Sequence, residues 1–330
     1  MTETGKRIEW IDLAKGICIF LVVFQHVSVA LDIDYPLKAQ FTSFRMPLYF
    51  ILSGLFFKQY NGFIGFLKRK TNKLLIPFLF FLLTTSVIPF AIINHESSLK
   101  LFFSDMNGPV YNFAIWFLLC LFEINLLFYL IQWAVGNLKT KHQDIIVLAI
   151  SLLLGFCGLG LGVAQVKNPM YLCTMLTALP FFVFGWWLRR HTNFLTQPFN
   201  YRRDVPLGIV YLVIVATCAY RVVYAFNTVP REGVPFIYLC DIAGTMLVLT
   251  ISKFIKRIPF VSFWGRYSII VLCTHQVIVI AMGGLLHSYL SGVPLFIAVL
   301  ASTLFICHLL IIFMKKYMPH VTAQKDVIRI

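Results

Sequence analysis

The stretch FRMPLYFILSGLFF, residues 44–57, combines an almost continuous apolar run with four residues that a lipid-facing helix does not need. Arg45, Pro47, Ser53 and Gly54 each cost helix stability or apolar transfer energy unless a neighbouring segment compensates for them. The stretch therefore predicts a membrane helix that packs against other helices of the same chain.

The composition predicts an integral membrane protein, because 59% of the 330 residues are hydrophobic and only 12% are charged. Ten apolar runs are candidates for crossing about 30 Å of hydrocarbon, and in lipid such runs must be helices. They lie at about 13–31, 44–57, 74–93, 113–135, 144–163, 171–188, 205–224, 235–254, 267–286 and 294–314. We expect an all-α bundle of about ten transmembrane helices, formed by residues 1–330 as a single membrane domain.

The formal net charge of +15 indicates topology more than nucleic-acid binding. With ten spans and both termini in the cytosol, only six of the 28 Lys and Arg residues fall on the outer side, which is the positive-inside pattern. They are Lys38, Arg45, Lys100, Lys167, Arg221 and Arg231. No motif that reads a nucleic-acid groove accompanies the charge, so a nucleic-acid partner is not expected. The inner basic clusters suit an anionic cytosolic ligand.

The eight cysteines all fall inside the apolar runs, and none forms a CxxC pair, so neither a disulfide framework nor a metal site is indicated. We expect them to be small core residues. A cleaved signal peptide is a weaker interpretation of the N-terminus, because Asp12 and Lys15 interrupt its apolar stretch.

Ionisable residues at membrane depth are candidates for function. In the first run, Lys15 precedes His26 by eleven residues, which is about 16 Å and close to three full turns, so both should lie on one helix face. A neutral imidazole is a common general base, although a histidine hydrogen-bonded to a neighbouring helix is a structural alternative. Further polar residues in apolar runs are Glu123, Asp241, His275 and His308.

Several motifs occur in a recognisable order along the chain. Asp12-x-x-Lys15-Gly16 is followed by His26, by FRMPLYFILSGLFF, and by KRKTNKLLIPFLF at 68–80. Weaker matches are Trp116 with Glu123, FFVFGWW at 181–187 and WGRYSIIVLCTH at 264–275. Together they resemble the acyltransferase 3 family of integral membrane O-acyltransferases, most closely its fucose 4-O-acetylase-like branch. Lysines stand at Lys15, Lys70 and Lys73, where that family often has arginine, so bidentate contacts are less assured.

The resemblance implies transfer of an acyl group, most simply acetyl, from cytosolic acyl-CoA to a hydroxyl of a cell-surface glycan or its lipid-linked precursor. His26 would act as general base or as acyl carrier, with Lys15 and Glu123 as further catalytic candidates. Lys15, Lys68, Arg69, Lys70 and Lys73 would bind the donor phosphates, although the 68–73 cluster can also be a topology signal. Acyl-CoA would be a co-substrate, and no permanently bound cofactor is expected.

The acceptor would contact Arg45, Ser53, Trp116 and His275 in this interpretation. Arg45 would lie at the outer surface, where snorkelling to lipid headgroups is the alternative. We expect the second helix to pack on the first, with Gly54 allowing close approach and Pro47 at the helix entrance. Asp12 should pair with Lys15 or cap the first helix.

Two other classes of function stay open at this stage. A transporter or flippase of a glycan precursor would need the same polar interior but no acyl donor, and a sensory or scaffolding protein would tolerate replacement of His26. The resemblance implies a multi-pass protein of the bacterial cytoplasmic membrane, in contact with membrane lipid. Assembly as a homo-oligomer and the identity of the acceptor stay open.

Overall fold

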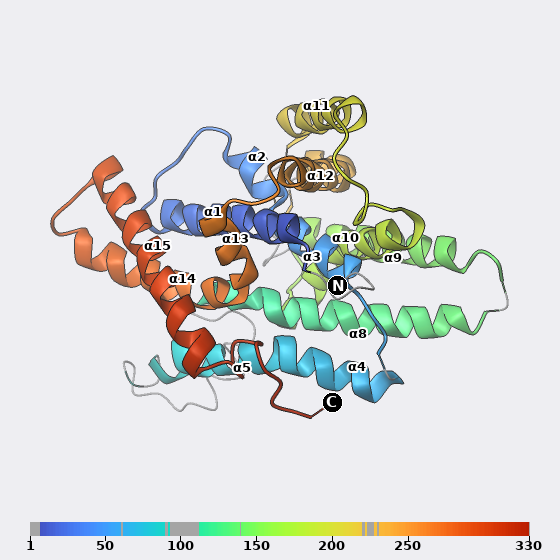
Figure 1. The fold of residues 1–330 in the computed structure, drawn as a ribbon, viewed down its shortest axis with the longest axis horizontal. Helices are drawn as coiled ribbons and strands as arrows, with labels where there is room; N and C mark the ends of the chain where they lie inside the picture. Colours follow the sequence, from blue (N-terminus) through green and yellow to red (C-terminus); the bar gives the residue numbers. More distant parts are fainter. Residues whose placement is uncertain are drawn as a thin grey trace. The chain divides into compact units, whose positions relative to one another are not determined.

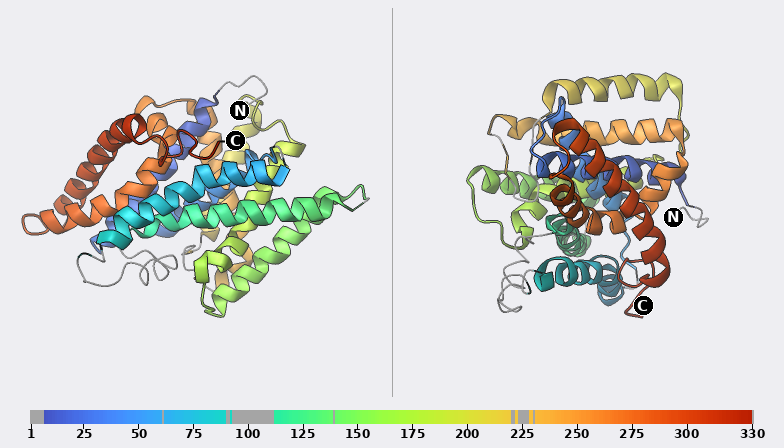
Figure 2. Two further views of the ribbon diagram at one scale, coloured as in Figure 1. Left: turned by 90° about the horizontal axis from the view of Figure 1, so that it is seen from below. Right: turned by 90° about the vertical axis from the view of Figure 1, so that its left-hand side faces the viewer.

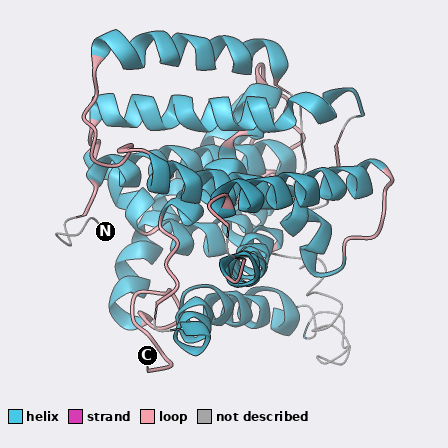
Figure 3. Cartoon of the chain, turned by 90° about the vertical axis from the view of Figure 1, so that its right-hand side faces the viewer, coloured by secondary structure: helices cyan, strands magenta, loops and turns pink. Residues whose placement is uncertain are grey.

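The computed structural model describes residues 7–60, 62–89, 92, 112–138, 140–219, 222, 228–229 and 231–329. Helices connected by loops and turns make up this part of the chain, and no strand occurs within it (Figure 3). The expected all-α class is therefore confirmed for the described residues.

The chain divides into two compact units, which we describe separately. Unit 1 comprises Met1–Cys18, Leu37–Tyr60 and Glu123–Arg266, and unit 2 comprises Ile19–Pro36, Asn61–Phe122 and Tyr267–Ile330. Two long helices, α1 (Glu9–Ala30) and α8 (Trp116–Gly136), both labelled in Figure 1, contain residues of each unit.

The remaining elements each belong to one unit. Unit 1 includes α2 (Lys38–Ser43), α3 (Arg45–Leu55), α9 (Gln143–Val163), η4 (Pro169–Tyr171), α10 (Leu172–His191), α11 (Tyr201–Cys218), η6 (Arg231–Phe236), α12 (Ile237–Ile255) and α13 (Pro259–Arg266). Unit 2 includes α4 (Gly62–Lys70), η1 (Thr71–Leu75), α5 (Ile76–Leu82), η2 (Leu83–Val87), η3 (Phe113–Ile115), α14 (Ser268–Leu286) and α15 (Gly292–Tyr317).

Seven helices among the described residues are long and apolar enough to cross a membrane. They are Glu9–Ala30, Phe113–Gly136, Gln143–Val163, Pro169–His191, Gly233–Ile255, Ser268–Leu286 and Gly292–Tyr317, and they coincide with seven of the ten predicted runs. The protein is therefore an integral membrane protein.

The other three predicted runs differ from single spanning helices. Run 44–57 falls on α3, which has only eleven residues and is separated at Phe44 from the six-residue α2 before it. Run 205–224 falls on α11, whose first turn carries Arg202, Arg203 and Asp204, and its residues 220–221 and 223–224 lie outside the described residues. Run 74–93 passes through π-helical η1 and η2, and its residues 90, 91 and 93 also lie outside the described residues.

Unit 1 is built around a close crossing of α3 and α10, each of which offers a glycine to the other. A Cβ added to Gly54 would lie 1.8 Å from the carbonyl oxygen of Phe182, and one added to Gly185 would lie 1.9 Å from that of Ile51. Small residues let helix backbones approach in this way inside a membrane. The partner of Gly54 is therefore α10, which corrects the expectation that it would be the first helix.

The first helix does contact α3, but through polar groups. The Tyr49 hydroxyl donates to the Lys15 carbonyl oxygen at 2.9 Å, and the Cys18 thiol lies 3.4 Å from the Arg45 carbonyl oxygen. Gly16 of α1 is covered by α13, since a Cβ at that position would lie 2.0 Å from the Val261 carbonyl oxygen. Pro47 lies in the first turn of α3, where its missing N–H is tolerated, as expected.

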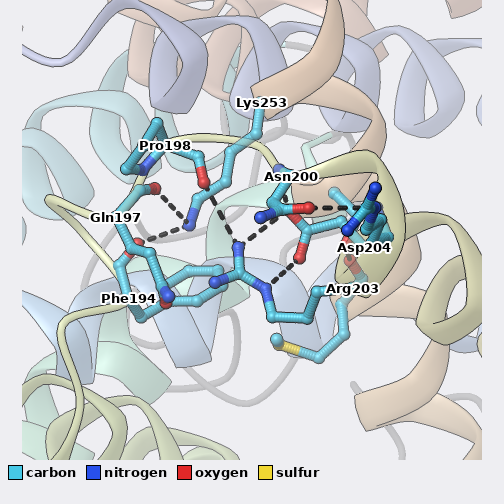
Figure 4. A network of polar contacts seen from close by, with 10 residues as sticks. Phe194, Gln197, Pro198, Asn200, Arg203, Asp204 and Lys253 are labelled. Carbon is cyan, nitrogen blue, oxygen red and sulfur yellow. Dashed lines mark hydrogen bonds and ion pairs between the residues drawn. The ribbon is translucent and has the colours of Figure 1, made fainter.

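A cation–aromatic cluster joins the ends of three helices of unit 1. The Lys253 ammonium, near the end of α12, lies 3.7 Å from the centroid of the Phe194 ring and 5.0 Å from that of Trp10. It also donates to the carbonyl oxygen of Phe194 in the loop that follows α10 (Figure 4). In the first turn of α11, directly after this loop, Arg203 pairs with Asp204 at 2.6 Å. The cluster ties the loop to the first turn of α1.

Unit 2 contains the last two helices, α14 and α15, which pack against each other and lie beside one another in the left view of Figure 2. The second half of α1 joins this unit, where Phe24 packs edge-on against Phe296 of α15 at a centroid distance of 5.0 Å. These contacts place the part of α1 that carries His26 in the same unit as α14, which carries His275.

All eight cysteines are free thiols, and six of them are buried, as expected for small core residues. Cys157 is exposed, so the expectation is wrong at that position. It lies on α9, a span that is mostly exposed, whereas the span that contains α10 is mostly buried within the protein. A thiol on such a helix faces the surface that we assign to lipid.

Candidate functional site

The candidate site of unit 2 is centred on two histidine side chains from helices distant in the sequence. The Nδ1 atom of His26 on α1 lies 2.6 Å from the Nε2 atom of His275 on α14. The ring centroids are 4.8 Å apart and the ring planes differ by 19°, so the two rings meet edge to edge in nearly the same plane. His275 is fully buried, and His26 is half-buried.

The sequence singled out both histidines but not their contact. His275 was expected to touch the acceptor, whereas the structure places its ring against His26. Its other nitrogen, Nδ1, lies 2.7 Å from the carbonyl oxygen of Val271, one turn earlier on α14. A ring held at both nitrogens has a fixed orientation, so His275 is part of the framework that holds His26.

The segment that leads into α8 is fastened to α14 on either side of His275. The Asn112 amide nitrogen donates to the Cys273 carbonyl oxygen at 2.7 Å, and the Ala114 N–H donates to Gln276 Oε1 at 2.6 Å. Trp116, a predicted acceptor contact, is buried at the start of α8, directly after this segment. The sequence analysis did not single out Asn112 or Gln276. Two signals could have found them: Gln276 is next to His275 in the sequence, and Asn112 is a polar residue directly before an apolar run.

The basic cluster of residues 68–73 also belongs to unit 2, and its members have different surroundings. Lys68, Arg69 and Lys70 form the last turn of α4, where Lys70 lies 5.6 Å from the centroid of the Phe66 ring. Burial, together with the positive charge of Arg69, lowers the pKa of Lys70 to about 8. Lys70 therefore carries its charge at neutral pH and loses it on mild alkalinisation.

The C-terminal segment of the described chain covers the end of this cluster. Lys73 donates to the Ala323 carbonyl oxygen at 2.8 Å and pairs with Asp326 at 2.9 Å. The fully buried Asn72 donates to the Ile328 carbonyl oxygen and accepts from the N–H groups of Val327 and Ile328, all within 2.9 Å. The charge of Lys73, a predicted donor-binding residue, is thus already compensated within unit 2.

The predicted site residues of unit 1 have fewer polar contacts. Asp12 forms two hydrogen bonds with Arg7, at 2.5 and 2.9 Å, which corrects the expected pairing with Lys15. Lys15 is half-buried on α1, which runs without interruption from Glu9 to Ala30 and carries His26 three turns later.

Arg45 does not lie at an outer surface, because it is only 8% exposed and its carbonyl oxygen contacts Cys18, nine residues into α1. Cys18 lies about 13 Å from the start of α1, and the whole helix is about 33 Å long. Arg45 therefore starts α3 beside the middle part of α1. The expected exposure at an outer surface and the snorkelling alternative are therefore wrong, and contact of Arg45 with an acceptor stays a prediction. The physical reason is that α2 already carries the chain part of the way inward.

Glu123, Ser53 and Asp241 make no hydrogen bond within the described part of the chain. Glu123 is half-buried with its Oε2 atom inaccessible, and Asp241 of α12 is 1% exposed. Ser53 is half-buried on α3. Among the predicted site residues, His275 is the one that the structure shows within hydrogen-bond distance of His26. A polar cavity of about 370 Å³ in unit 1 lies elsewhere, beside Arg190 and Asp144.

In a comparison with known protein families, the acyltransferase 3 model, described as an acyltransferase domain, matches residues 8–312. This range covers nearly the whole chain and includes both histidines, the basic cluster and the α3–α10 crossing. Neither the curated proteins nor the solved structures gave a match.

Proposed function

The chain belongs to the acyltransferase 3 family and is an integral membrane acyltransferase, and from that premise we propose that it is an O-acetyltransferase of the bacterial cytoplasmic membrane. The donor is cytosolic acetyl-CoA, and the acceptor is a hydroxyl of a cell-surface glycan or of its lipid-linked precursor. The fucose 4-O-acetylase-like motifs of the sequence support this choice of acceptor class.

The observation that carries the proposal is the position of His26, an imidazole inside a membrane helix with its Nδ1 atom engaged by His275. In the proposed reaction, His26 removes the proton of the acceptor hydroxyl while the hydroxyl oxygen attacks the thioester carbonyl carbon. The new C–O bond forms, the C–S bond breaks, and the CoA thiolate takes the proton from His26. An acetyl ester and free CoA are the products.

Lys68, Arg69 and Lys70 at the end of α4 are the proposed contacts of the donor phosphates, since they bring three cationic side chains together in one turn. Lys73 contributes less, because Asp326 already pairs with it. Lys15, on the helix of His26, is placed to attract the anionic donor toward that helix.

The test of the proposal is transfer of radiolabel from [14C]acetyl-CoA to the glycan fraction of membranes that contain the protein. We expect label in that fraction, with a KM for acetyl-CoA that rises above pH about 8 as Lys70 loses its proton. Membranes without the protein are the control. A transporter or flippase needs no acyl donor, so movement of the glycan precursor without labelling would support that alternative and overturn this proposal.

We further propose ten spans with both termini in the cytosol, and contacts within unit 1 support this number. Trp10, Phe194 and Lys253 meet in one cluster, so the chain must cross the membrane an even number of times between any two of them. The seven candidate helices supply only one crossing between residues 194 and 253. A crossing by α11 makes the number even.

The same argument applies nearer the N-terminus. Arg189 donates to the Leu55 carbonyl oxygen at 3.1 Å, but the candidate helices supply three crossings between these residues. A crossing at 74–93 makes four. Arg189 lies in the last turn of α10, shortly before Phe194, so Leu55 is on the same side of the membrane as Phe194 and Trp10. Since α1 crosses the membrane once after Trp10, α2 and α3 together must complete a second crossing before Leu55. These three additions raise seven spans to ten.

Epitope insertions distinguish ten spans from seven. With a cytosolic N-terminus, ten spans place an epitope after Lys58 inside and one after Ser288 outside, whereas the seven candidates alone would reverse both positions. The measurement is antibody labelling of intact and permeabilised cells. Labelling of the Lys58 epitope in intact cells would contradict the ten-span topology.

A further inference from the structure

The histidine pair is the end of a chain of three groups whose hydrogen-bond directions can be worked out. The Val271 carbonyl oxygen lies 2.7 Å from His275 Nδ1, and His275 Nε2 lies 2.6 Å from His26 Nδ1. A carbonyl oxygen can only accept, so Nδ1 of His275 must carry a proton and donate it to Val271. This fixes the first direction without any assumption about the two rings.

The remaining directions follow from the chemistry of imidazole. A neutral ring has one N–H and one lone pair, so Nε2 of His275 has the lone pair when Nδ1 has the proton. The contact between the rings then requires His26 to donate from Nδ1. In consequence, the lone pair of neutral His26 is on Nε2.

We propose that His275 is the positioning residue of the acetyl transfer: it holds His26 in the tautomer whose Nε2 atom is the base. This inference rests on the proposed function for the identity of the reaction. During attack, the acceptor proton binds to His26 Nε2, and the resulting imidazolium donates from Nδ1 to the lone pair of His275. The thiolate of CoA then takes the proton from Nε2, which returns His26 to its starting tautomer.

The surroundings of His275 explain how it keeps this role. Its side chain is fully buried, so water does not compete for either nitrogen. On either side of it along α14, Asn112 binds the Cys273 carbonyl oxygen and Ala114 binds the Gln276 side chain. The Thr274 hydroxyl is turned back to the Ile270 carbonyl oxygen at 2.8 Å. These bonds leave the helix little freedom to rotate His275 away from His26.

The decisive variants are His275→Leu and His275→Gln in the full-length protein. Leucine removes the acceptor for His26 Nδ1, and we expect kcat for acetyl transfer to fall about 10²- to 10⁴-fold with an unchanged KM for acetyl-CoA, as when a base is held in the wrong tautomer. Glutamine offers a carbonyl oxygen to His26 Nδ1, so it should restore at least about tenfold of that loss. His287→Leu, at the exposed end of the same helix, is the matched control and should leave both parameters unchanged.

A second measurement reads the tautomer directly and does not depend on turnover. In 15N-histidine-labelled protein in detergent, His26 should show a protonated Nδ1 and an unprotonated Nε2, and His275→Leu should shift the proton to Nε2. A His26 tautomer that is the same in both proteins would overturn the inference, as would a His275→Leu enzyme with normal kcat. An absence of labelled product from the unmodified protein would instead overturn the proposed function and leave the tautomer result standing.

Discussion

Replacing His26 with glutamine is expected to abolish acetyl transfer without unfolding the protein. Glutamine is similar in size and still forms hydrogen bonds, so the loss of folding stability should be about 1 kcal/mol. It cannot take up and release a proton near neutral pH, so the contribution of general-base catalysis, about 10²- to 10⁴-fold, should disappear. The measurement is kcat with [14C]acetyl-CoA, paired with the yield of folded protein in the membrane.

The control is the same substitution at His287, which is exposed at the end of α14 and should keep full activity. Binding of acetyl-CoA to the His26→Gln protein should also persist, since the cationic residues proposed to bind the phosphates are on α4. Near-normal transfer by that protein would rule out a catalytic role for His26. Label that stays on the unmodified protein and is lost in the variant would point to an acyl-histidine intermediate in place of direct transfer.

Replacing Gly54 with alanine is expected to prevent the native packing of α3 on α10. The added Cβ would lie 1.8 Å from the backbone carbonyl oxygen of Phe182, and a backbone atom cannot move aside as a flexible side chain can. Overpacking in a well-packed core costs about 1–3 kcal/mol, and a clash between backbones should lie at or above the upper end. We expect low yield and a strongly reduced melting temperature in detergent.

Gly160 provides the matched control, because it lies in helix α9 with nothing within 4 Å of an added Cβ. Alanine there should be neutral or stabilising by up to about 1 kcal/mol, since glycine is a poor helix former. Gly185→Ala should resemble Gly54→Ala, because the two glycines face each other's helices. Equal melting temperatures for Gly54→Ala and Gly160→Ala would show that α3 and α10 do not approach as closely as described here.

Local sequence patterns predicted much of the helical framework but not the partners of its helices. Seven apolar runs coincide with candidate spanning helices, because a membrane imposes a length and an apolar composition that each segment satisfies alone. The glycine of FRMPLYFILSGLFF indicated a close approach, but the choice of α10 over α1 depends on Gly185, which is 131 residues away by its number in the chain. Complementary surfaces of this kind are not visible in one segment.

In the candidate site, too, individual residues could be predicted from the sequence but their contacts could not. His26 and His275 were each marked by the cost of a polar ring at membrane depth, which is a local signal. Their hydrogen bond joins residues 249 positions apart and depends on how α1 and α14 pack. Lys73 shows the converse: it was predicted from a basic run to bind the donor, which stays a prediction, and nothing in the sequence indicated its ion pair with Asp326. Without the fold, a charge pattern gives the number of cations but not which of them are already neutralised.

The contact between Asn72 and the end of the chain has a consequence for biosynthesis. The hydrogen bond from Asn72 to Ile328 joins residues 256 positions apart, so at 5–20 residues per second the ribosome makes the partner roughly 13–50 s after Asn72. During that interval the amide side chain, fully buried in the finished protein, has none of these three bonds. The segment around η1 therefore matures only after the last helix has been inserted. A chain that ends before residue 327 would lack all three of these hydrogen bonds to the Asn72 side chain.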